Sequence, residues 1–199
     1  MTKLTSLSLA QNKLTGELSF DIGDLVSLES LHFNDNSFTG TIPVSIQDLT
    51  NLQVFDVATN ELHGTLMAEM SALTSLVDLE LHDNRFNGTI PAEWDAFTNL
   101  RTLSIARTDL SGTIPPGLCQ RSSENRMIIV YDCEGGQVDC GDCGCVCYTD
   151  APTMAPFEQP SGAPSPVPSA GPTGKVSTIP HGVTPLPTFF LRSRTFSYT

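Results

Sequence analysis

The sequence repeats every 24 residues over residues 1–121, and this period restricts the fold more than any other feature. The stretch FNDNSFTGTIP at 33–43 returns as LHDNRFNGTIP at 81–91. The rows align without insertion or deletion and begin at Leu4, Leu28, Leu52, Leu76 and Leu100. One repeat of this length cannot bury its apolar face alone, so consecutive rows must stack. The sequence therefore predicts a solenoid of five coils.

Each column of the aligned rows holds one kind of residue. Apolar residues stand two apart, as at Leu7 and Leu9, so both face the same side of a short strand. A buried amide both donates and accepts hydrogen bonds, so the asparagine column should join neighbouring coils and not take part in catalysis. This column contains Asn12, Asn36, Asn60 and Asn84, with Thr108 in the fifth row. A glycine in every row and a proline in three predict a turn and an extended outer segment.

These columns resemble the plant-type leucine-rich repeat, LxxLxxLxLxxNxLxGxIPxxLxxLxx. The resemblance implies an α/β solenoid, a right-handed arc with a parallel sheet on its concave side and short 3₁₀ turns outside. Receptor-like proteins and polygalacturonase-inhibitor-like proteins carry such repeats. Trp94 shares an apolar column with Ile22, Ile46, Met70 and Leu118, so we expect it in the core and not at a binding surface.

The first row begins in the middle of a repeat. Met1, Thr2 and Lys3 align with the closing triplets of later rows. Solenoids normally begin with a unit that covers the first edge of the core, and the alignment finds no such N-terminal cap. We interpret the chain as a fragment, so the lack of a signal peptide says little about its compartment.

All six cysteines lie within residues 119–147, directly after the last repeat position at Leu118. We expect this block to cap the C-terminal end of the solenoid, with residues 127–133 as a final strand. The spacing allows three disulfides of unknown pairing or a four-cysteine metal site. The resemblance to cysteine-containing flanks of secreted repeat proteins, and to caps of algal, diatom-like repeat proteins, favours disulfides. The cysteines are Cys119, Cys133, Cys140, Cys143, Cys145 and Cys147.

Residues 148–199 have a different composition, with ten of the 14 prolines among Ser, Thr, Ala and Gly. Such a segment cannot bury enough apolar surface to offset its ordering entropy, so we predict a disordered stalk or a passive tail. Residues 1–147 carry 20 acidic and 7 basic residues, a net charge of about −13. An acidic body argues against nucleic acid and fits a cationic or polar partner. No apolar run is long enough to span a membrane, so membrane attachment would need segments absent from this sequence.

Solvent-facing residues between the inward strand positions should form a grid whose rows lie about 4.8 Å apart. In this grid Asp56 and Glu80 stand side by side, with Asp78 and Asp83 nearby. Like charges at this spacing repel, and a basic group or a cation would relieve the repulsion. Ordinary solvated surface acids are the alternative interpretation. The predicted ligand-binding surface on the concave face comprises His32, Asp35, Asp56, Asp78, Glu80, His82, Asp83 and Arg107.

The pattern favours a recognition module and not an enzyme. The sequence contains no phosphate loop, no kinase motif and no His/Ser/Asp constellation, so we expect no catalytic residue, cofactor or metal. The resemblance implies an extracellular or cell-surface receptor-like protein that binds a protein, peptide or glycan ligand. The alternatives are a secreted inhibitor of a cell-wall hydrolase and a metal-binding protein acting through the cysteine block. Asn87-Gly88-Thr89 is an N-glycosylation motif, although the repeat pattern alone also produces these residues.

Overall fold

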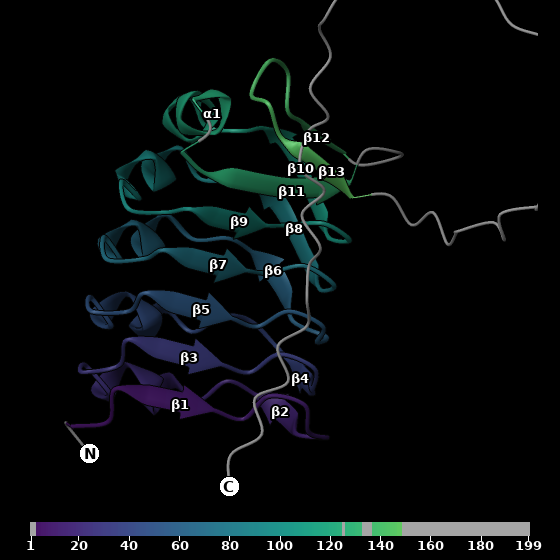
Figure 1. Ribbon diagram of the computed structural model, residues 1–199. Coiled ribbons are helices and arrows are strands. Elements are labelled where there is room, and N and C mark those ends of the chain that lie inside the picture. The colour runs from purple at the N-terminus through teal and green to yellow at the C-terminus, as the bar shows by residue number, and fades with distance from the viewer. Residues whose placement is uncertain (1–2, 125, 133–136, 149–199) are drawn as a thin grey trace, which may run out of the picture. The chain divides into compact units, whose positions relative to one another are not determined.

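The structure is a computed structural model, and it describes residues 3–124, 126–132 and 137–148. All of them belong to one compact unit, Met1–Pro152. Each 24-residue row forms one coil with a short strand, a turn, a second short strand and an outer helix, and the coils stack as predicted (Figure 1). Residues 149–199, which contain nearly all of the predicted stalk or tail, lie outside the described residues.

The first strands of the coils form a seven-stranded parallel sheet, here called the main sheet, in the order β1-β3-β5-β7-β9-β11-β13. Its register follows the repeat, so Leu7 pairs with Leu31, and Leu31 with Phe55. The predicted final strand within 127–133 is present as β11, whereas β13 was not predicted from the sequence. The strands are β1 (Ser6–Ser8), β3 (Ser30–His32), β5 (Val54–Asp56), β7 (Asp78–Glu80), β9 (Thr102–Ser104), β11 (Ile128–Asp132) and β13 (Val146–Tyr148).

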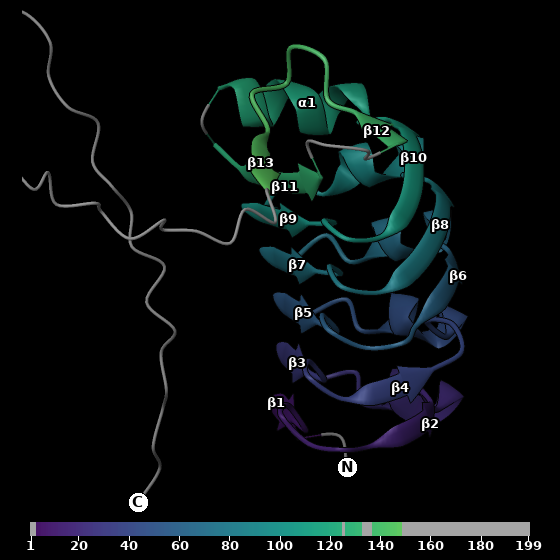
Figure 2. The ribbon, with the colours of Figure 1, turned by 90° about the vertical axis from the view of Figure 1, so that its right-hand side faces the viewer.

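A second set of strands, not predicted from the sequence, lies on a different side of the coils (Figure 2). Four of them form the lateral sheet, in the order β12-β10-β8-β6, and β2 pairs with β4. Four of these strands, β2, β6, β8 and β10, each contain one residue of the glycine column, and the remaining glycine of the column directly follows β4. The φ angles of these glycines lie between +78° and +93°, which residues with a side chain rarely adopt. The strands are β2 (Thr15–Glu17), β4 (Ser37–Thr39), β6 (His63–Thr65), β8 (Arg85–Thr89), β10 (Asp109–Thr113) and β12 (Gln137–Asp139).

Short helices close the outer side of each coil, and the predicted 3₁₀ turns are confirmed. Pro43 and Pro91 stand just before two of these helices in extended backbone, with φ of −69° and −62°. The fifth coil carries an α-helix in place of the 3₁₀ helix. The helices are η1 (Phe20–Asp24), η2 (Val44–Asp48), η3 (Ala68–Ala72), η4 (Ala92–Ala96) and α1 (Pro116–Ser123).

The core lies between the main sheet and the outer helices. The inward residues of the central strands, such as Phe55 and Leu79, are fully buried. Trp94 is also fully buried, and its indole N–H donates to the carbonyl oxygen of Met67 at 3.0 Å. The prediction that Trp94 belongs to the core is therefore confirmed.

The asparagine column forms the expected ladder between coils. The Asn60 amide donates to the carbonyl oxygens of Phe33, in the preceding coil, and Val57, at 3.0 and 3.1 Å. Its Oδ1 accepts from the backbone N–H of Phe38 at 2.9 Å. Asn36 and Asn84 repeat this arrangement in their own coils. These residues are structural, as predicted.

The residue before each ladder position adopts a left-handed backbone, which the sequence analysis did not predict. The φ angles of these five residues lie between 53° and 57°. This conformation directs their backbone N–H groups to the next coil, as in the bond from Thr59 N to His82 O at 3.0 Å. The five residues are Gln11, Asp35, Thr59, Asp83 and Arg107.

Among the described residues, two disulfides hold the C-terminal cap. Cys119 pairs with Cys143 and Cys140 with Cys145, so three cysteines of the alternative metal site are oxidised. The four-cysteine metal site is therefore wrong, since a metal needs free thiolates. Cys133 lies outside the described residues, as does the side chain of Cys147, so a third disulfide stays a prediction. None of the helices in the described ranges has the length and hydropathy to cross a membrane.

Candidate ligand-binding surface

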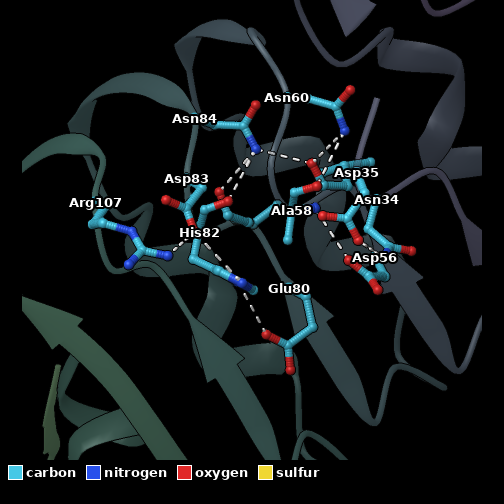
Figure 3. Close-up of polar contacts among 12 residues, drawn as sticks. Asn34, Asp35, Asp56, Ala58, Asn60, Glu80, His82, Asp83, Asn84 and Arg107 are labelled. Atoms are coloured by element: carbon cyan, nitrogen blue, oxygen red, sulfur yellow. Dashed lines mark hydrogen bonds and ion pairs between the residues drawn. The ribbon is translucent and has the colours of Figure 1, made fainter. Parts of the chain in front are cut away.

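The predicted surface residues lie on the main sheet and on the turns that follow its strands. Register places His32 opposite Asp56, and Asp56 opposite Glu80, on β3, β5 and β7. Asp78 shares β7 with Glu80 and stands two residues before it, on the same face. Asp35, His82, Asp83 and Arg107 follow on the turns (Figure 3). All eight residues thus lie along one side of the coils.

Glu80 is the electrostatic centre of this surface. Its pKa is raised from 4.5 to about 7, mainly by burial and also by the negative charges of Asp56 and Asp78, while a hydrogen bond from Ser104 acts in the opposite direction. A carboxylate loses solvation when it is partly buried and is repelled by like charges, and both effects favour its protonated form. Near neutral pH, Glu80 therefore exchanges a proton readily, and a nearby cation would shift it to the charged form.

His82 lies between two carboxylates. Its Nδ1 is 3.6 Å from Glu80 Oε2 and its Nε2 is 3.8 Å from Asp83 Oδ2 (Figure 3). Burial lowers the pKa of His82, and the positive charge of Arg107 lowers it further, whereas Asp83 acts in the opposite direction. The contacts to both carboxylates are longer than hydrogen bonds. With burial as the largest cause and a pKa below 6.5, His82 is mainly neutral at pH 7.

Asp83 is already paired within the protein. Its carboxylate binds the guanidinium of Arg107, and the two side chains come from neighbouring coils. This ion pair neutralises one of the predicted acidic groups. The surface therefore has two parts, an acidic part formed by Asp56, Asp78 and Glu80 and a paired part formed by Asp83 and Arg107.

The remaining predicted residues lie at the margin of the acidic part. His32 Nδ1 is 3.9 Å from Asp56 Oδ2, a contact that needs a protonated histidine to form an ion pair. Asp56 Oδ1 also accepts from the backbone N–H of Ala58 at 3.1 Å, which fixes the carboxylate. Asp35 is exposed and accepts from the Asn34 amide at 2.9 Å.

Two residues that position this surface were not predicted from the sequence. Ser104 is buried on β9 and bonds to Glu80. Asp132 on β11 accepts the backbone N–H of Arg107 at 2.7 Å, in the place where the other coils offer a carbonyl oxygen. The repeat register could have predicted Ser104, since Ser104 occupies the column of Glu80 in the next repeat. Asp132 lies beyond the repeat, so no column predicts it. Within the described ranges, no group of His, Cys, Asp and Glu is arranged to hold a metal ion.

The leucine-rich repeat model matches residues 3–25, 27–49 and 99–120. No curated protein matches the chain. Among solved structures from Arabidopsis thaliana, a chain of the BIR3–SERK2 complex is 32% identical, with a TM-score of 0.59, over 70% of this chain and 74% of that one.

Two longer receptor ectodomains are equally similar over a smaller part of their length. HAESA, solved with an N-terminally extended IDA peptide hormone ligand, is 32% identical with a TM-score of 0.59, over 64% of this chain and 22% of its own. GASSHO1/SCHENGEN3, in complex with CASPARIAN STRIP INTEGRITY FACTOR 2, has the same identity and TM-score, over 65% of this chain and 16% of its own. The repeats, the coil geometry and these relatives together show that the chain belongs to the leucine-rich repeat family.

Proposed function

We propose that this chain is a non-catalytic ligand-binding module of an extracellular or cell-surface leucine-rich repeat protein. We further propose that it binds a peptide or protein segment with a basic side chain on the acidic part of the main sheet. Asp56, Asp78 and Glu80 are the primary contacts. His32, Asp35 and His82 flank them, and the Asp83–Arg107 pair sets the position of the adjacent turns.

One observation carries this proposal: Asp56 and Glu80 occupy directly paired positions on neighbouring strands. At a strand spacing of about 4.8 Å, two carboxylates repel, and Asp78 adds a third charge to the same region. The raised pKa of Glu80 has burial as its largest cause and this repulsion as a second cause. An ammonium or guanidinium group would replace the repulsion with attraction and lower the pKa of Glu80.

Two further features support an extracellular binding role. HAESA, a relative from the same family, was solved with a peptide hormone ligand. Disulfides such as Cys119–Cys143 and Cys140–Cys145 in the C-terminal cap are typical of oxidising compartments. A solenoid with a rigid parallel sheet also presents side chains on a regular grid, which suits the recognition of an extended peptide.

The test is a binding experiment with the full chain, secreted with an added signal peptide, against an array of peptides that carry arginine at fixed positions. The double variant Asp56→Asn/Asp78→Asn keeps the size of both side chains and one acceptor oxygen in each, but removes two charges. We expect it to bind the selected peptide about tenfold more weakly, or about 1.4 kcal/mol. The matched control is Glu69→Gln/Glu93→Gln, which removes two exposed charges from η3 and η4 on the outer side.

Binding should also weaken as the pH falls from 8 to 5.5, because Glu80 then takes up the proton that the cationic ligand would displace. Equal weakening by both double variants would mean that only the net charge of the protein matters. Selection of neutral or acidic peptides, or of a glycan, would contradict the proposed ligand class while leaving the binding role intact.

A further inference from the structure

The lateral sheet carries an acceptor motif that the proposed ligand surface does not use. Asn87, Gly88 and Thr89 belong to β8, and the side chains of Asn87 and Thr89 are both exposed. Gly88 has a φ of +80°, as its equivalents do in the other coils. The motif is therefore displayed on regular, well-packed backbone on the flank of the solenoid.

Asn87 differs from the ladder asparagine three residues before it. Asn84 is buried, and its side chain donates to three carbonyl oxygens and accepts from one backbone N–H. Asn87, by contrast, has no side-chain hydrogen bond to any described residue. The ladder thus explains why Asn84 is present, whereas no packing or hydrogen bond explains Asn87.

Thr89 is held in place by the next coil. Its Cγ2 lies 3.1 Å from the point that a Cβ of Gly112 would occupy, so the methyl group packs over that glycine. Thr41 and Thr65 pack over Gly64 and Gly88 in the same way. Packing therefore uses the methyl group of Thr89, and its hydroxyl makes no hydrogen bond to a described residue.

We propose that Asn87 carries an N-linked glycan. In this reaction the Asn87 Nδ2 attacks the anomeric carbon of an oligosaccharide linked to a polyprenyl diphosphate. A C–N bond forms, the bond from that carbon to the diphosphate oxygen breaks, and the amide loses one proton as the polyprenyl diphosphate leaves. No oxidation or reduction occurs. The Asn-x-Thr motif is the acceptor that secretory transferases recognise. The proposal goes beyond ligand binding and needs only that the chain enters the secretory pathway.

The position of Asn87 gives the glycan a directional effect. β8 lies on a different side of the coil from β7, which carries Asp78 and Glu80 (Figure 2). In the lateral sheet Asn87 pairs with Thr65 on β6 and Asp109 on β10, so a bulky sugar would cover the middle of that sheet. The glycan would therefore keep protein partners off the lateral sheet and leave the main sheet accessible.

The test uses the full chain, secreted from eukaryotic cells with an added signal peptide. Enzymatic removal of N-glycans in H₂¹⁸O, followed by peptide mass spectrometry, marks each occupied asparagine as labelled aspartate, once the label gained without the enzyme by spontaneous deamidation of Asn87-Gly88 is subtracted. Asn87→Gln and Thr89→Ala should both abolish the label, whereas Thr89→Ser keeps the motif and the label. His63→Asn creates the same motif at the equivalent position one coil earlier, before Gly64 and Thr65. It should add a second glycan.

A secreted chain with unlabelled Asn87 would overturn the proposal, and it would do so whether or not His63→Asn gains a sugar. Label on the unchanged chain and on Thr89→Ser supports it even if Asn87→Gln fails to be secreted. The predicted position of the glycan on the lateral sheet is tested separately. A peptide that binds the main sheet should have affinities for the glycosylated and deglycosylated protein that agree within about twofold. A tenfold gain on deglycosylation would overturn the directional effect. Absence of any peptide binding would instead count against the proposed ligand surface alone.

Discussion

The same apolar columns are exposed at one end of the solenoid and buried at the other. At the β1 end, Leu4, Leu9 and Leu14 are exposed by 37%, 36% and 38%. Four coils later, the equivalent residues are exposed by at most 2%. These equivalents are Leu100, Ile105 and Leu110. The column therefore determines which way a side chain points, and the neighbouring coil determines how much that side chain contributes to stability.

The elements after the last repeat account for the difference. β11 extends the main sheet beyond β9, and its Ile129 is fully buried. α1 and the disulfide Cys119–Cys143 lie over the same end. The described residues place no such cover on the β1 end. An open pocket of about 330 Å³ lies in the first two coils, lined by Leu9, Leu18 and other apolar residues together with Glu17, Ser19 and Asp21. The stability of a solenoid coil thus depends on how well its apolar surface is covered on both sides.

The largest expected effect comes from removing one core leucine at each end. Leu103 is fully buried on β9, so Leu103→Ala should reduce the free energy of unfolding by about 4 kcal/mol. Leu7 occupies the same column on β1 but is only half-buried, so Leu7→Ala should cost about 1 kcal/mol. Urea unfolding followed by circular dichroism measures both. Equal losses would mean that the β1 end is covered in solution.

The next effect tests the cover itself. Cys119 and Cys143 are 24 residues apart in sequence, and replacing both with serine should cost about 3.5 kcal/mol by the loop-entropy relation. The double variant should also weaken the cover on the C-terminal end of the solenoid, so that this end becomes as uncovered as the β1 end. Amide hydrogens of β9 should then exchange faster. The control is Cys140→Ser/Cys145→Ser, which opens a loop of 5 residues and should cost about 2 kcal/mol. A larger loss from the shorter loop would contradict the entropic argument.

A smaller effect depends on pH and on position along the main sheet. The pKa of Glu80 is raised from 4.5 to about 7, so the folded protein holds this proton more tightly than the unfolded chain does. The stability that the Glu80 proton contributes is fully present below pH 4.5 and is lost as the pH rises toward 7. Glu80→Gln should therefore raise the free energy of unfolding at pH 7.5 and leave it unchanged at pH 4. The full shift corresponds to about 3 kcal/mol, and the 27% exposure of the side chain reduces our expectation to about 2 kcal/mol.

The control for Glu80 is an exposed glutamate at the open end. Glu17→Gln should change stability by less than about 0.5 kcal/mol at either pH. The lowered pKa of His82 acts with the opposite sign, since it makes stability fall as the pH drops below 6.5. Both variants keep the burial of His82, which is the largest cause of its lowered pKa, so this cause is common to both variants. A gain from Glu80→Gln that is equal at pH 4 and 7.5 would show that packing and not charge is responsible.

The repeat predicted the features that recur and missed those that occur once or concern only the backbone. The columns were sufficient for the main sheet, the asparagine ladder, the buried Trp94 and the pairing of Asp56 with Glu80. Asp132 replaces a carbonyl oxygen beyond the last repeat, and no periodicity points to such a residue. The Asp83–Arg107 ion pair depends on side-chain reach across coils, which the columns leave open.

The left-handed column was missed because its residues share no side-chain type. Gln11, Asp35, Thr59, Asp83 and Arg107 have only their backbone conformation in common. In soluble proteins Asn, Asp and Gly occupy this region most readily, and β-branched residues occupy it least. The cost is therefore not uniform along the solenoid, and it should be highest at Thr59.

The smallest expected effect follows from this cost. Thr59 is exposed at a φ of 54°, so Thr59→Asn should stabilise the protein by about 1 kcal/mol by relieving the clash of its branched side chain. Thr50→Asn, at another exposed position without positive φ, should bring no gain. Gln11→Asn applies the same change at the β1 end, where we expect the first coil to open locally before the whole chain unfolds. Its gain in global stability should therefore be smaller than that of Thr59→Asn, and an equal gain would mean that the first coil unfolds together with the rest.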